Sequence, residues 1–295
     1  MNSVSATSTA QPQVHNSGLW EHMPSPPPAP VFEPLPPPKH PIERLSNFSF
    51  HSAILPDDRT VSVYLPPQYE QEPERRFPVF YLHDGQNLFD PDTSYVTGHT
   101  WRAGTTADHL NWTGQAEPVI LVGVWNTGMR RMAEYTPTRD YRLGGGEGHR
   151  YGRLLVEELK PWIDNNFRTL PHASDTALGG SSLGGLITLY LGLEYPGVFG
   201  RLAVISPSVW WNQRSILGFI AEFEGTPKPK IWLDIGTAEG TRHVRDTELL
   251  HRRLVQQGWK PGVDLELSKV SGGVHSENAW AARFDQVLSF LFPSA

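Results

Sequence analysis

The pattern of hydrophobic and polar positions predicts strands that alternate with helices over most of the chain. Two early stretches, residues 48–55 and 60–65, alternate well enough to form two antiparallel strands. Short apolar runs predict buried strands at residues 77–82, 119–124, 176–179, 201–206, 230–235 and 265–270. Apolar residues at helical spacing predict helices at residues 151–167, 183–193, 216–223, 242–257 and 279–292. This order favours an α/β fold with a mostly parallel sheet, helices on both faces and antiparallel strands at the N-terminal edge.

The start of the chain has a different composition. Residues 1–41 hold 11 of the 27 prolines, and the runs at 26–28 and 36–38 favour extended polyproline II structure. We therefore predict a proline-rich, flexible segment at residues 1–44 and a folded domain at residues 45–295. A ligand for a proline-recognition module, or an arm that packs on a partner, is the alternative interpretation of the segment.

Composition narrows the classes of function. The net charge is −6 and no basic stripe is present, which argues against nucleic acid or an anionic membrane as a partner. The absence of cysteine excludes disulfides, cysteine nucleophiles and thiolate metal sites. Residues 1–17 lack the features of a signal peptide, and no stretch approaches the roughly 18 apolar residues of a membrane helix. We expect a soluble, cytoplasmic protein.

Residues 180–184 carry the pattern of a serine nucleophile. Their sequence, GSSLG, matches G-x-S-x-G with Ser182 at the centre. In this motif a strand turns sharply into a helix with the serine at the strained apex, and glycines are needed where the chain crowds itself. An apolar strand precedes the motif here and an apolar helix follows it. We predict Ser182 as the nucleophile; the alternative is a glycine-rich turn without chemistry.

A serine nucleophile requires a base, which follows it in the order serine, acid, histidine. Three histidines follow Ser182 in the chain, namely His243, His251 and His275. The first two fall on the helix predicted at 242–257, where a solvent-exposed histidine is common. His275 follows the last predicted strand, in a glycine-containing loop that opens a helix. We predict His275 as the base.

The acid of the triad is expected after the strand predicted at 230–235. Glu239 lies in the loop at the end of that strand, Asp234 lies inside the strand, and Asp246 lies inside the following helix. The acid would hold the tautomer of the histidine and stabilise its imidazolium form. We predict Glu239 for this role, with Asp234 and Asp246 as the alternatives.

Loops at other strand ends supply candidates for the oxyanion hole and the pocket. One donor should be the backbone amide of Leu183, and the second should be that of Gly85 or Gln86, in the loop after the strand at 77–82. Trp210 and Trp211 follow the strand at 201–206, so they are candidates to contact substrate in the same cleft. Core packing is the alternative for both tryptophans.

The loop after residues 77–82 is rich in polar side chains. His83 and Asp84 lie directly at the strand end and are candidates for substrate contacts, and Asp90 and Asp92 follow. Together they suggest a metal cluster, but their spacing matches no calcium loop or zinc motif. We predict no metal.

These motifs together resemble the putative-esterase family, which includes enterochelin-type siderophore esterases, feruloyl and acetylxylan esterases, S-formylglutathione hydrolase and mycolyltransferases. The residues that carry the resemblance are Tyr81 to Asp90, Glu134 to Pro137, Gly180 to Gly184, Ser206 to Trp211, Gly236 to Glu239 and Gly272 to His275. They span roughly residues 45 to 292.

The resemblance implies an α/β-hydrolase catalytic domain without a cofactor, and it supports Ser182, Glu239 and His275 as the catalytic residues. It further implies that Arg131 and Glu134 lie near the cleft. The expected activity is hydrolysis of a small-molecule carboxylic ester, with a siderophore, an aryl ester such as a ferulate, or a short-acyl ester as substrate. Acyl transfer to a sugar or alcohol, and a catalytically silent binding module, are the alternatives. A homo-oligomer is compatible with these features.

Overall fold

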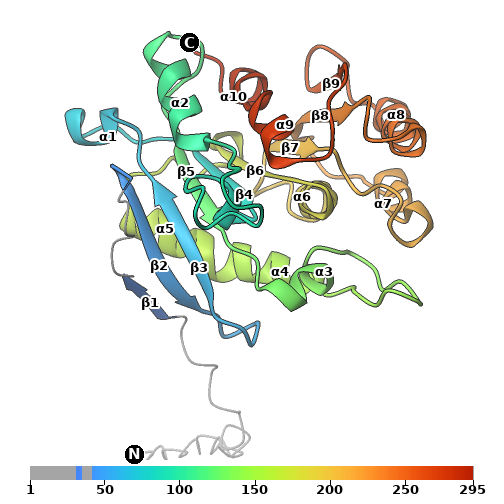
Figure 1. The fold of residues 1–295 in the computed structure, drawn as a ribbon, viewed down its shortest axis with the longest axis horizontal. Helices are drawn as coiled ribbons and strands as arrows, with labels where there is room; N and C mark the ends of the chain where they lie inside the picture. Colours follow the sequence, from blue (N-terminus) through green and yellow to red (C-terminus); the bar gives the residue numbers. More distant parts are fainter. Residues whose placement is uncertain (1–30, 35–41, 295) are drawn as a thin grey trace, which may run out of the picture.

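The computed structural model describes residues 31–34 and 42–294, which form one nine-stranded sheet with helices on both faces (Figure 1). The order across the sheet is β1-β2-β3-β5-β4-β6-β7-β8-β9. The strands are β1 (Val31–Pro34), β2 (Leu45–His51), β3 (Arg59–Tyr64), β4 (Val79–His83), β5 (Ile120–Val124), β6 (Thr176–Ser181), β7 (Arg201–Ile205), β8 (Lys230–Gly236) and β9 (Leu265–Val270).

Pairing within the sheet changes direction once, at β5. The pairs β1–β2, β2–β3 and β3–β5 are antiparallel, and every pair from β5 to β9 in the sheet order is parallel. This confirms the predicted fold class, with a mostly parallel sheet and antiparallel strands at the N-terminal edge. Because the parallel strands end at one edge, the loops after β4, β6, β7 and β8 can meet there.

The helices differ widely in length. The longer segments are α2 (Ala103–Trp112), α4 (Gly148–Arg153), η3 (Leu154–Leu159), α5 (Lys160–Asn166), α6 (Leu183–Glu194), α7 (Ile216–Ala221), α8 (Thr241–Gln256), α9 (Glu277–Ala281) and α10 (Phe284–Leu291). The short turns are α1 (Gln68–Gln71), η1 (Gly85–Asn87), η2 (Gly128–Arg130), α3 (Arg131–Glu134), η4 (Ala173–Asp175) and η5 (Trp211–Arg214).

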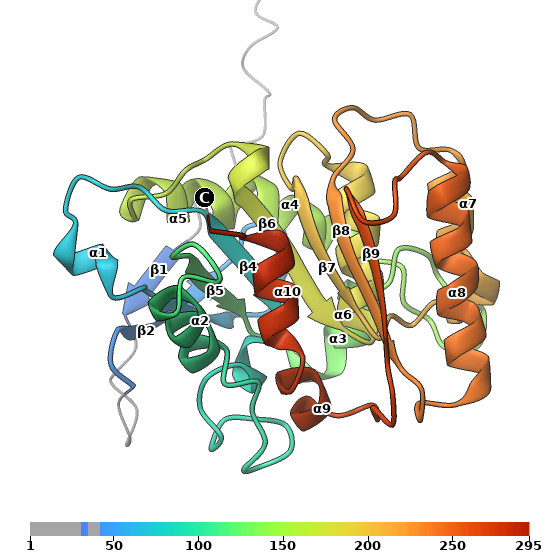
Figure 2. The ribbon, with the colours of Figure 1, turned by 90° about the horizontal axis from the view of Figure 1, so that it is seen from above.

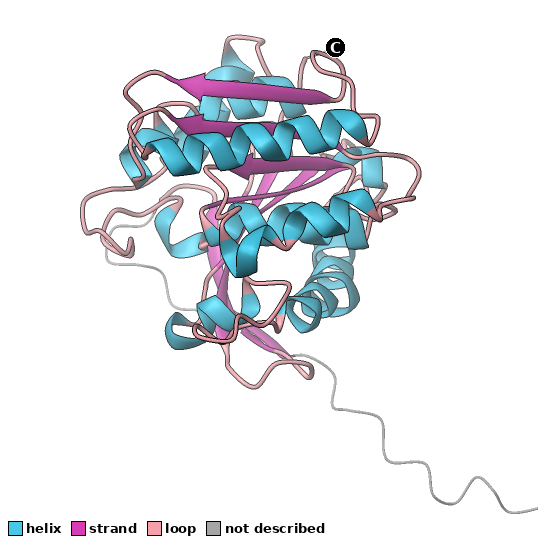
Figure 3. Ribbon diagram, turned by 90° about the vertical axis from the view of Figure 1, so that its right-hand side faces the viewer, coloured by secondary structure: helices cyan, strands magenta, loops and turns pink. Residues whose placement is uncertain are grey.

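Side-chain alternation along the strands divides the core into two layers. In β4, Val79 and Tyr81 join the cluster that contains the apolar faces of η3, α5, α6, α7 and α8. Phe80 and Leu82 point to the opposite face, where α2 and α10 pack. This is the period of two that places successive side chains on opposite faces of a sheet. Figures 2 and 3 show the sheet between these two layers of helices.

Three differences from the predicted elements concern the last helix, helix α2 and the N-terminal edge of the sheet. The helix predicted at 279–292 is two helices, α9 and α10, that meet at Arg283. Helix α2 was not predicted, because its ten residues carry few apolar side chains. Residues 31–34 of the proline-rich segment form β1, which pairs with β2 at the edge of the sheet, so the sheet begins before residue 45. Both triple-proline runs lie outside the described residues.

The described residues lack the features of a membrane-spanning helix and of a clustered metal site. None of the helices in residues 31–34 and 42–294 has the length and apolar character that a membrane crossing requires. Within the same ranges, no group of three or more histidine, aspartate or glutamate side chains could hold a metal ion.

Candidate active site

Ser182 occupies a strained turn between β6 and α6, at the centre of the sheet. Its backbone has φ 61° and ψ −119°, a conformation that a non-glycine residue rarely adopts. The backbone at two neighbouring glycines packs too closely for a side chain. A Cβ on Gly185 would lie 2.8 Å from the carbonyl oxygen of Ile205, and one on Gly180 would lie 3.0 Å from the Cβ of His83. The local sequence therefore folds as the G-x-S-x-G motif predicts.

His275 and Glu239 come together from two other strand ends. Nδ1 of His275 lies 2.7 Å from Oε2 of Glu239. The carboxylate is enclosed, with 2% of its side chain exposed, and the imidazole is 45% exposed. The ring of Trp280 meets that of His275 edge-on, with centroids 4.8 Å apart. An exposed histidine fixed from behind by a buried acid can exchange protons with a ligand through its other nitrogen, Nε2.

Glu239 is held by hydrogen bonds on both carboxylate oxygens. Oε1 accepts from the Ser206 hydroxyl at 2.6 Å and from the backbone amide of Gly236 at 2.8 Å, and Arg283 Nη2 lies 3.6 Å from it. Burial alone would raise the pKa of Glu239, but the hydrogen bonds from His275, Ser206 and Gly236 outweigh it and lower the pKa below its usual value. The carboxylate therefore stays ionised beside the imidazole.

The two alternative acids have other partners. Asp234 is fully buried and binds the guanidinium of Arg283 at 2.8 Å, the indole of Trp232 at 2.9 Å and the amide of Ser206 at 3.1 Å. Asp246 is buried on α8 and binds Arg214 at 2.7 Å. In the described structure the carboxylate recorded in contact with His275 is that of Glu239.

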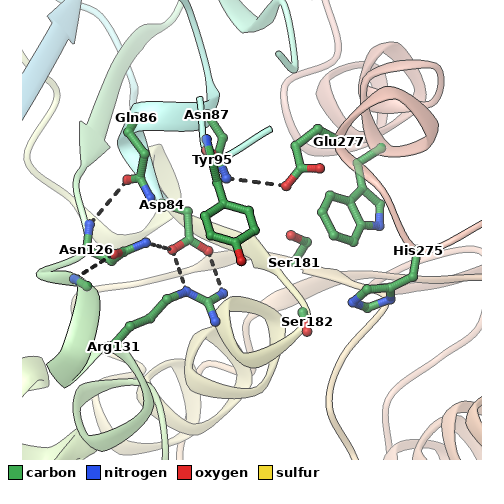
Figure 4. Close-up of a pocket in the computed structure, with 12 residues that line it drawn as sticks. Asp84, Gln86, Asn87, Tyr95, Asn126, Arg131, Ser181, Ser182, His275 and Glu277 are labelled. Carbon is green, nitrogen blue, oxygen red and sulfur yellow. Dashed lines mark hydrogen bonds and ion pairs between the residues drawn. The ribbon is translucent and has the colours of Figure 1, made fainter. Parts of the chain in front are cut away.

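Two hollows meet at Ser182 and His275. The larger has a volume of about 440 Å³ and is lined by Asp84, Gln86, Asn87, Tyr95, Asn126, Gly128, Arg131, Ser181, Ser182, His275, Glu277 and Trp280 (Figure 4). The smaller, of about 250 Å³, is lined by Ser182, Ser206, Pro207, Ser208, Trp210, Ile235, Glu239, His243 and His275. An ester whose carbonyl sits at Ser182 could place one moiety in each hollow.

One wall of the larger cleft is a compact ion pair. Asp84 accepts two hydrogen bonds of 2.7 Å from Nε and Nη2 of Arg131, and a third of 2.7 Å from the amide of Asn126. Figure 4 shows the planar guanidinium facing the carboxylate. Burial would lower the pKa of Arg131, but the adjacent Asp84 carboxylate outweighs it and raises the pKa. The Arg131 guanidinium therefore stays ionised and lies directly against the Asp84 carboxylate.

Three residues predicted to contact substrate or to lie near the cleft are buried and line neither hollow. His83 is buried, with Nδ1 2.9 Å from the hydroxyl of Tyr151. Glu134 is fully buried in a two-pronged ion pair of 3.0 Å with Arg59. Trp211 is fully buried, so the core-packing alternative holds for it. Direct contact with a ligand in either hollow is therefore wrong for these side chains, because each of them is directed to a partner in the interior.

The remaining predicted residues lie at the site. Asp84, Arg131 and Gln86 line the larger cleft, and Trp210 lines the smaller hollow. Gly85 packs against the next strand, since a Cβ there would lie 2.5 Å from the backbone carbon of Gly123. Gln86 is among the residues that line the larger cleft, and Gly85 is not.

Several lining residues were missed by the sequence reasoning. Asn126 follows β5, Glu277 begins α9, and Ser208 follows β7 with its Oγ 3.3 Å from that of Ser182. His243, on α8, lines the smaller hollow although it was interpreted as a solvent-exposed helix residue. Their positions in the sequence could have identified those that follow a strand. The ends of parallel strands meet at one edge of the sheet, so polar residues directly after each strand are candidates for the site.

Comparison with known sequences agrees with this architecture. The YbbA protein of Bacillus subtilis, whose function is uncharacterized, is 26% identical over 249 residues, 80% of this chain and 93% of that one. The ferri-bacillibactin esterase BesA of B. subtilis is 27% identical over 55% of this chain and 58% of its own length. An endo-1,4-beta-xylanase/feruloyl esterase of Xylanibacter ruminicola is 33% identical over 55% of this chain and 21% of its own length.

A solved structure and a family model complete the assignment. The BES protein from Bacillus cereus superposes with a TM-score of 0.72 at 21% identity, over 88% of this chain and 98% of that one, which shows the α/β-hydrolase fold. Residues 52–291 match the family model described as "Putative esterase". The chain therefore belongs to the putative esterase family and is a carboxylic ester hydrolase.

Proposed function

We propose that the chain hydrolyses carboxylic esters through a Ser182–His275–Glu239 triad and an acyl-enzyme intermediate. The observation that carries the proposal is the convergence of three strand ends. Ser182 sits in the strained turn after β6, His275 follows β9, and the buried Glu239 that binds its Nδ1 follows β8. A nucleophile, a base and an acid that orients the base are the parts that acyl transfer requires.

In the first step, Ser182 Oγ attacks the ester carbonyl and its proton passes to Nε2 of His275. Nδ1–H of the imidazolium donates to Oε2 of Glu239, which stabilises the positive charge. In the resting geometry Ser182 Oγ lies 3.3 Å from Ser208 Oγ, and the proposed step requires the serine hydroxyl to donate to the imidazole instead. Figure 4 shows the ring of His275 turned toward Ser182.

The developing oxyanion requires two preorganised donors. We assign them to the backbone amides of Leu183 and Gln86. Leu183 is the first residue of α6, so the positive end of the helix dipole adds to the effect. The tetrahedral intermediate then collapses, the alkoxide takes the proton from Nε2, and the acyl group stays on Ser182. Water repeats the sequence and releases the acid, which restores the enzyme.

The names of the relatives indicate a broad class of substrate and no single compound. By their names, BesA is a ferri-bacillibactin esterase, the Xylanibacter ruminicola enzyme is a feruloyl esterase, and a relative from Aspergillus fumigatus is a siderophore esterase. We propose an ester of this kind, or a short-acyl ester, as the substrate here. The two hollows, of about 440 and 250 Å³, leave room for a bulky group on one side of the carbonyl and a smaller one on the other.

The test is hydrolysis of p-nitrophenyl esters, from acetate to octanoate, by wild type and by Ser182→Ala. Turnover by the wild type with a loss of roughly a thousandfold or more in the variant supports the proposal. Ser181→Ala is the matched control, because it removes the neighbouring hydroxyl in the same motif. Equal activity of wild type and Ser182→Ala, or a comparable loss in Ser181→Ala alone, would overturn the assignment of the nucleophile.

A further inference from the structure

The charges that line the larger cleft are unbalanced. Apart from His275, the charged side chains lining it are Asp84, Arg131 and Glu277. Asp84 and Arg131 neutralise each other through two hydrogen bonds of 2.7 Å. The carboxylate of Glu277 has no cation recorded within salt-bridge distance among the described residues, and its recorded partner is the neutral amide of Asn87, at 3.5 Å. Arg131 also interacts electrostatically with Glu277, but one cation cannot balance two carboxylates, so the net formal charge of these three side chains is negative.

The position of Glu277 brings that charge close to the reacting centre. Glu277 is the first residue of α9, two positions after His275, and Ser276 between them caps the helix by accepting from the amide of Ala279. The cap fixes the backbone of the first turn. Figure 4 shows the Glu277 side chain entering the cleft opposite the Asp84–Arg131 pair, on the side of His275. A ligand that fills the cleft therefore meets this carboxylate.

The neutral groups around Glu277 fit a particular ligand chemistry. The amide of Asn87, the half-buried Asn126 and the exposed ring of Tyr95 share the cleft with it. Carboxylate oxygens accept hydrogen bonds and repel anions. A hydroxyl or ammonium group satisfies such an acceptor, whereas a carboxylate, a phosphate or a negatively charged metal complex at the same place is repelled.

We propose that Glu277 is a specificity-determining residue. It makes the larger cleft prefer esters that place a cationic group or an uncharged hydrogen-bond donor in that cleft, over anionic esters of equal size. This inference rests on the proposed function, since it assumes that the larger cleft holds one side of the ester. An anionic group about 6 Å from the Glu277 carboxylate would be repelled. At effective dielectric constants between 80 and 20, this repulsion lowers kcat/KM of the anionic ester relative to the neutral one by roughly 3- to 100-fold.

The experiment uses two series of esters, because the charge can sit on either side of the carbonyl. The first consists of acetate esters of choline, of its neutral isostere 3,3-dimethylbutanol, and of the anionic alcohol isethionate. The second consists of methyl esters of 4-trimethylammoniobutyrate, 5,5-dimethylhexanoate and glutarate. In each series kcat/KM of the charged esters is divided by that of the neutral one, so any general effect of a variant cancels.

In at least one series, wild type should prefer the cationic and neutral esters to the anionic ester by about tenfold, and less at high salt because screening weakens exposed charges. Glu277→Gln should abolish the preference, and Glu277→Lys should reverse it. Asp285→Asn is the matched control: it removes one carboxylate from the exposed start of α10, and it should leave the ratio as in wild type.

Two results would overturn the inference. One is a charge ratio in Glu277→Gln within twofold of that in wild type in both series. The other is an equal change in Asp285→Asn, which would assign the effect to net charge. Failure of the proposed function gives a different result, because a neutral ester would then not be hydrolysed, or would be hydrolysed equally by Ser182→Ala.

Discussion

Replacement of Glu239 by glutamine should leave the fold intact and place the wrong tautomer of His275 at the nucleophile. Oε1 of Glu239 accepts from two fixed donors, the hydroxyl of Ser206 at 2.6 Å and the amide of Gly236 at 2.8 Å. In the glutamine variant the amide oxygen must take this position, because an NH2 group there would face two donors. The NH2 group is then directed at Nδ1 of His275.

An NH2 group can only donate, so Nδ1 becomes an acceptor and the proton of the neutral imidazole moves to Nε2. A protonated Nε2 cannot take the proton of Ser182. The equivalent change in a serine protease lowers kcat by about 10⁴, and we expect a loss of 10³ to 10⁴ in kcat here. KM should change little, because Glu239 is 2% exposed and lies behind the imidazole.

The assay is steady-state hydrolysis of a p-nitrophenyl ester, with thermal unfolding as the check on folding. Asp246→Asn is the matched control, since Asp246 is also a buried carboxylate bound to a cationic partner, Arg214. It should keep kcat within about tenfold of wild type. A kcat of folded Glu239→Gln within tenfold of wild type, or a large loss in Asp246→Asn alone, would refute the reasoning and transfer the role to another acid.

Three further predictions concern the support of the site. Burial lowers the pKa of His83 from 6.5 to about 3, so between these pH values the unfolded chain binds more protons than the folded one. The free energy of unfolding should therefore fall by at most about 5 kcal/mol as pH drops from 6.5 to 3. Urea denaturation should show a smaller fall in His83→Gln. Arg283→Met leaves the buried carboxylate of Asp234 without its cation and should cost about 3–5 kcal/mol by the same measurement, whereas a cost below 1 kcal/mol would contradict the pairing. In Gly85→Ala the new Cβ would lie 2.5 Å from the backbone of Gly123, so the loop after β4 must shift. Because this loop is proposed to carry an oxyanion donor, kcat should fall at least tenfold. An unchanged kcat would show that the loop does not carry that donor.

The strand ends were the predictable part of the site. Periodicity predicted six buried strands, with helices between the last five of them, and chain order then pointed to Ser182, Glu239 and His275. These three belong to loops whose backbone position is set by the parallel sheet, and the strand ends bring them to one edge. The placement of these loops depends on the order of strands and helices along the chain, and the spacing of hydrophobic residues predicts that order.

The parts that escaped prediction depend on the direction of individual side chains. Arg131 and Glu134 are three residues apart on α3, and Arg131 lines the cleft whereas Glu134 pairs with the buried Arg59. Nothing in the local sequence says which of the two faces inward, because the buried partner comes from a strand 75 residues earlier. Glu277 was likewise missed, since a single glutamate at a helix start is ordinary helix chemistry.

The competition among three acids illustrates why charge assignment requires the fold. Asp234 lies in the interior of the sheet, where burial raises its pKa even though Arg283 beside it acts to lower the pKa. A carboxylate at this place therefore depends on a neighbouring cation. Arg283 is that cation, and its Nη2 also donates to the Ser206 hydroxyl at 2.6 Å. That hydroxyl donates in turn to Glu239. Asp234 is therefore joined to Glu239 of the proposed triad through Arg283 and Ser206. The strand acid that was the alternative candidate lies behind Glu239 in this hydrogen-bond chain.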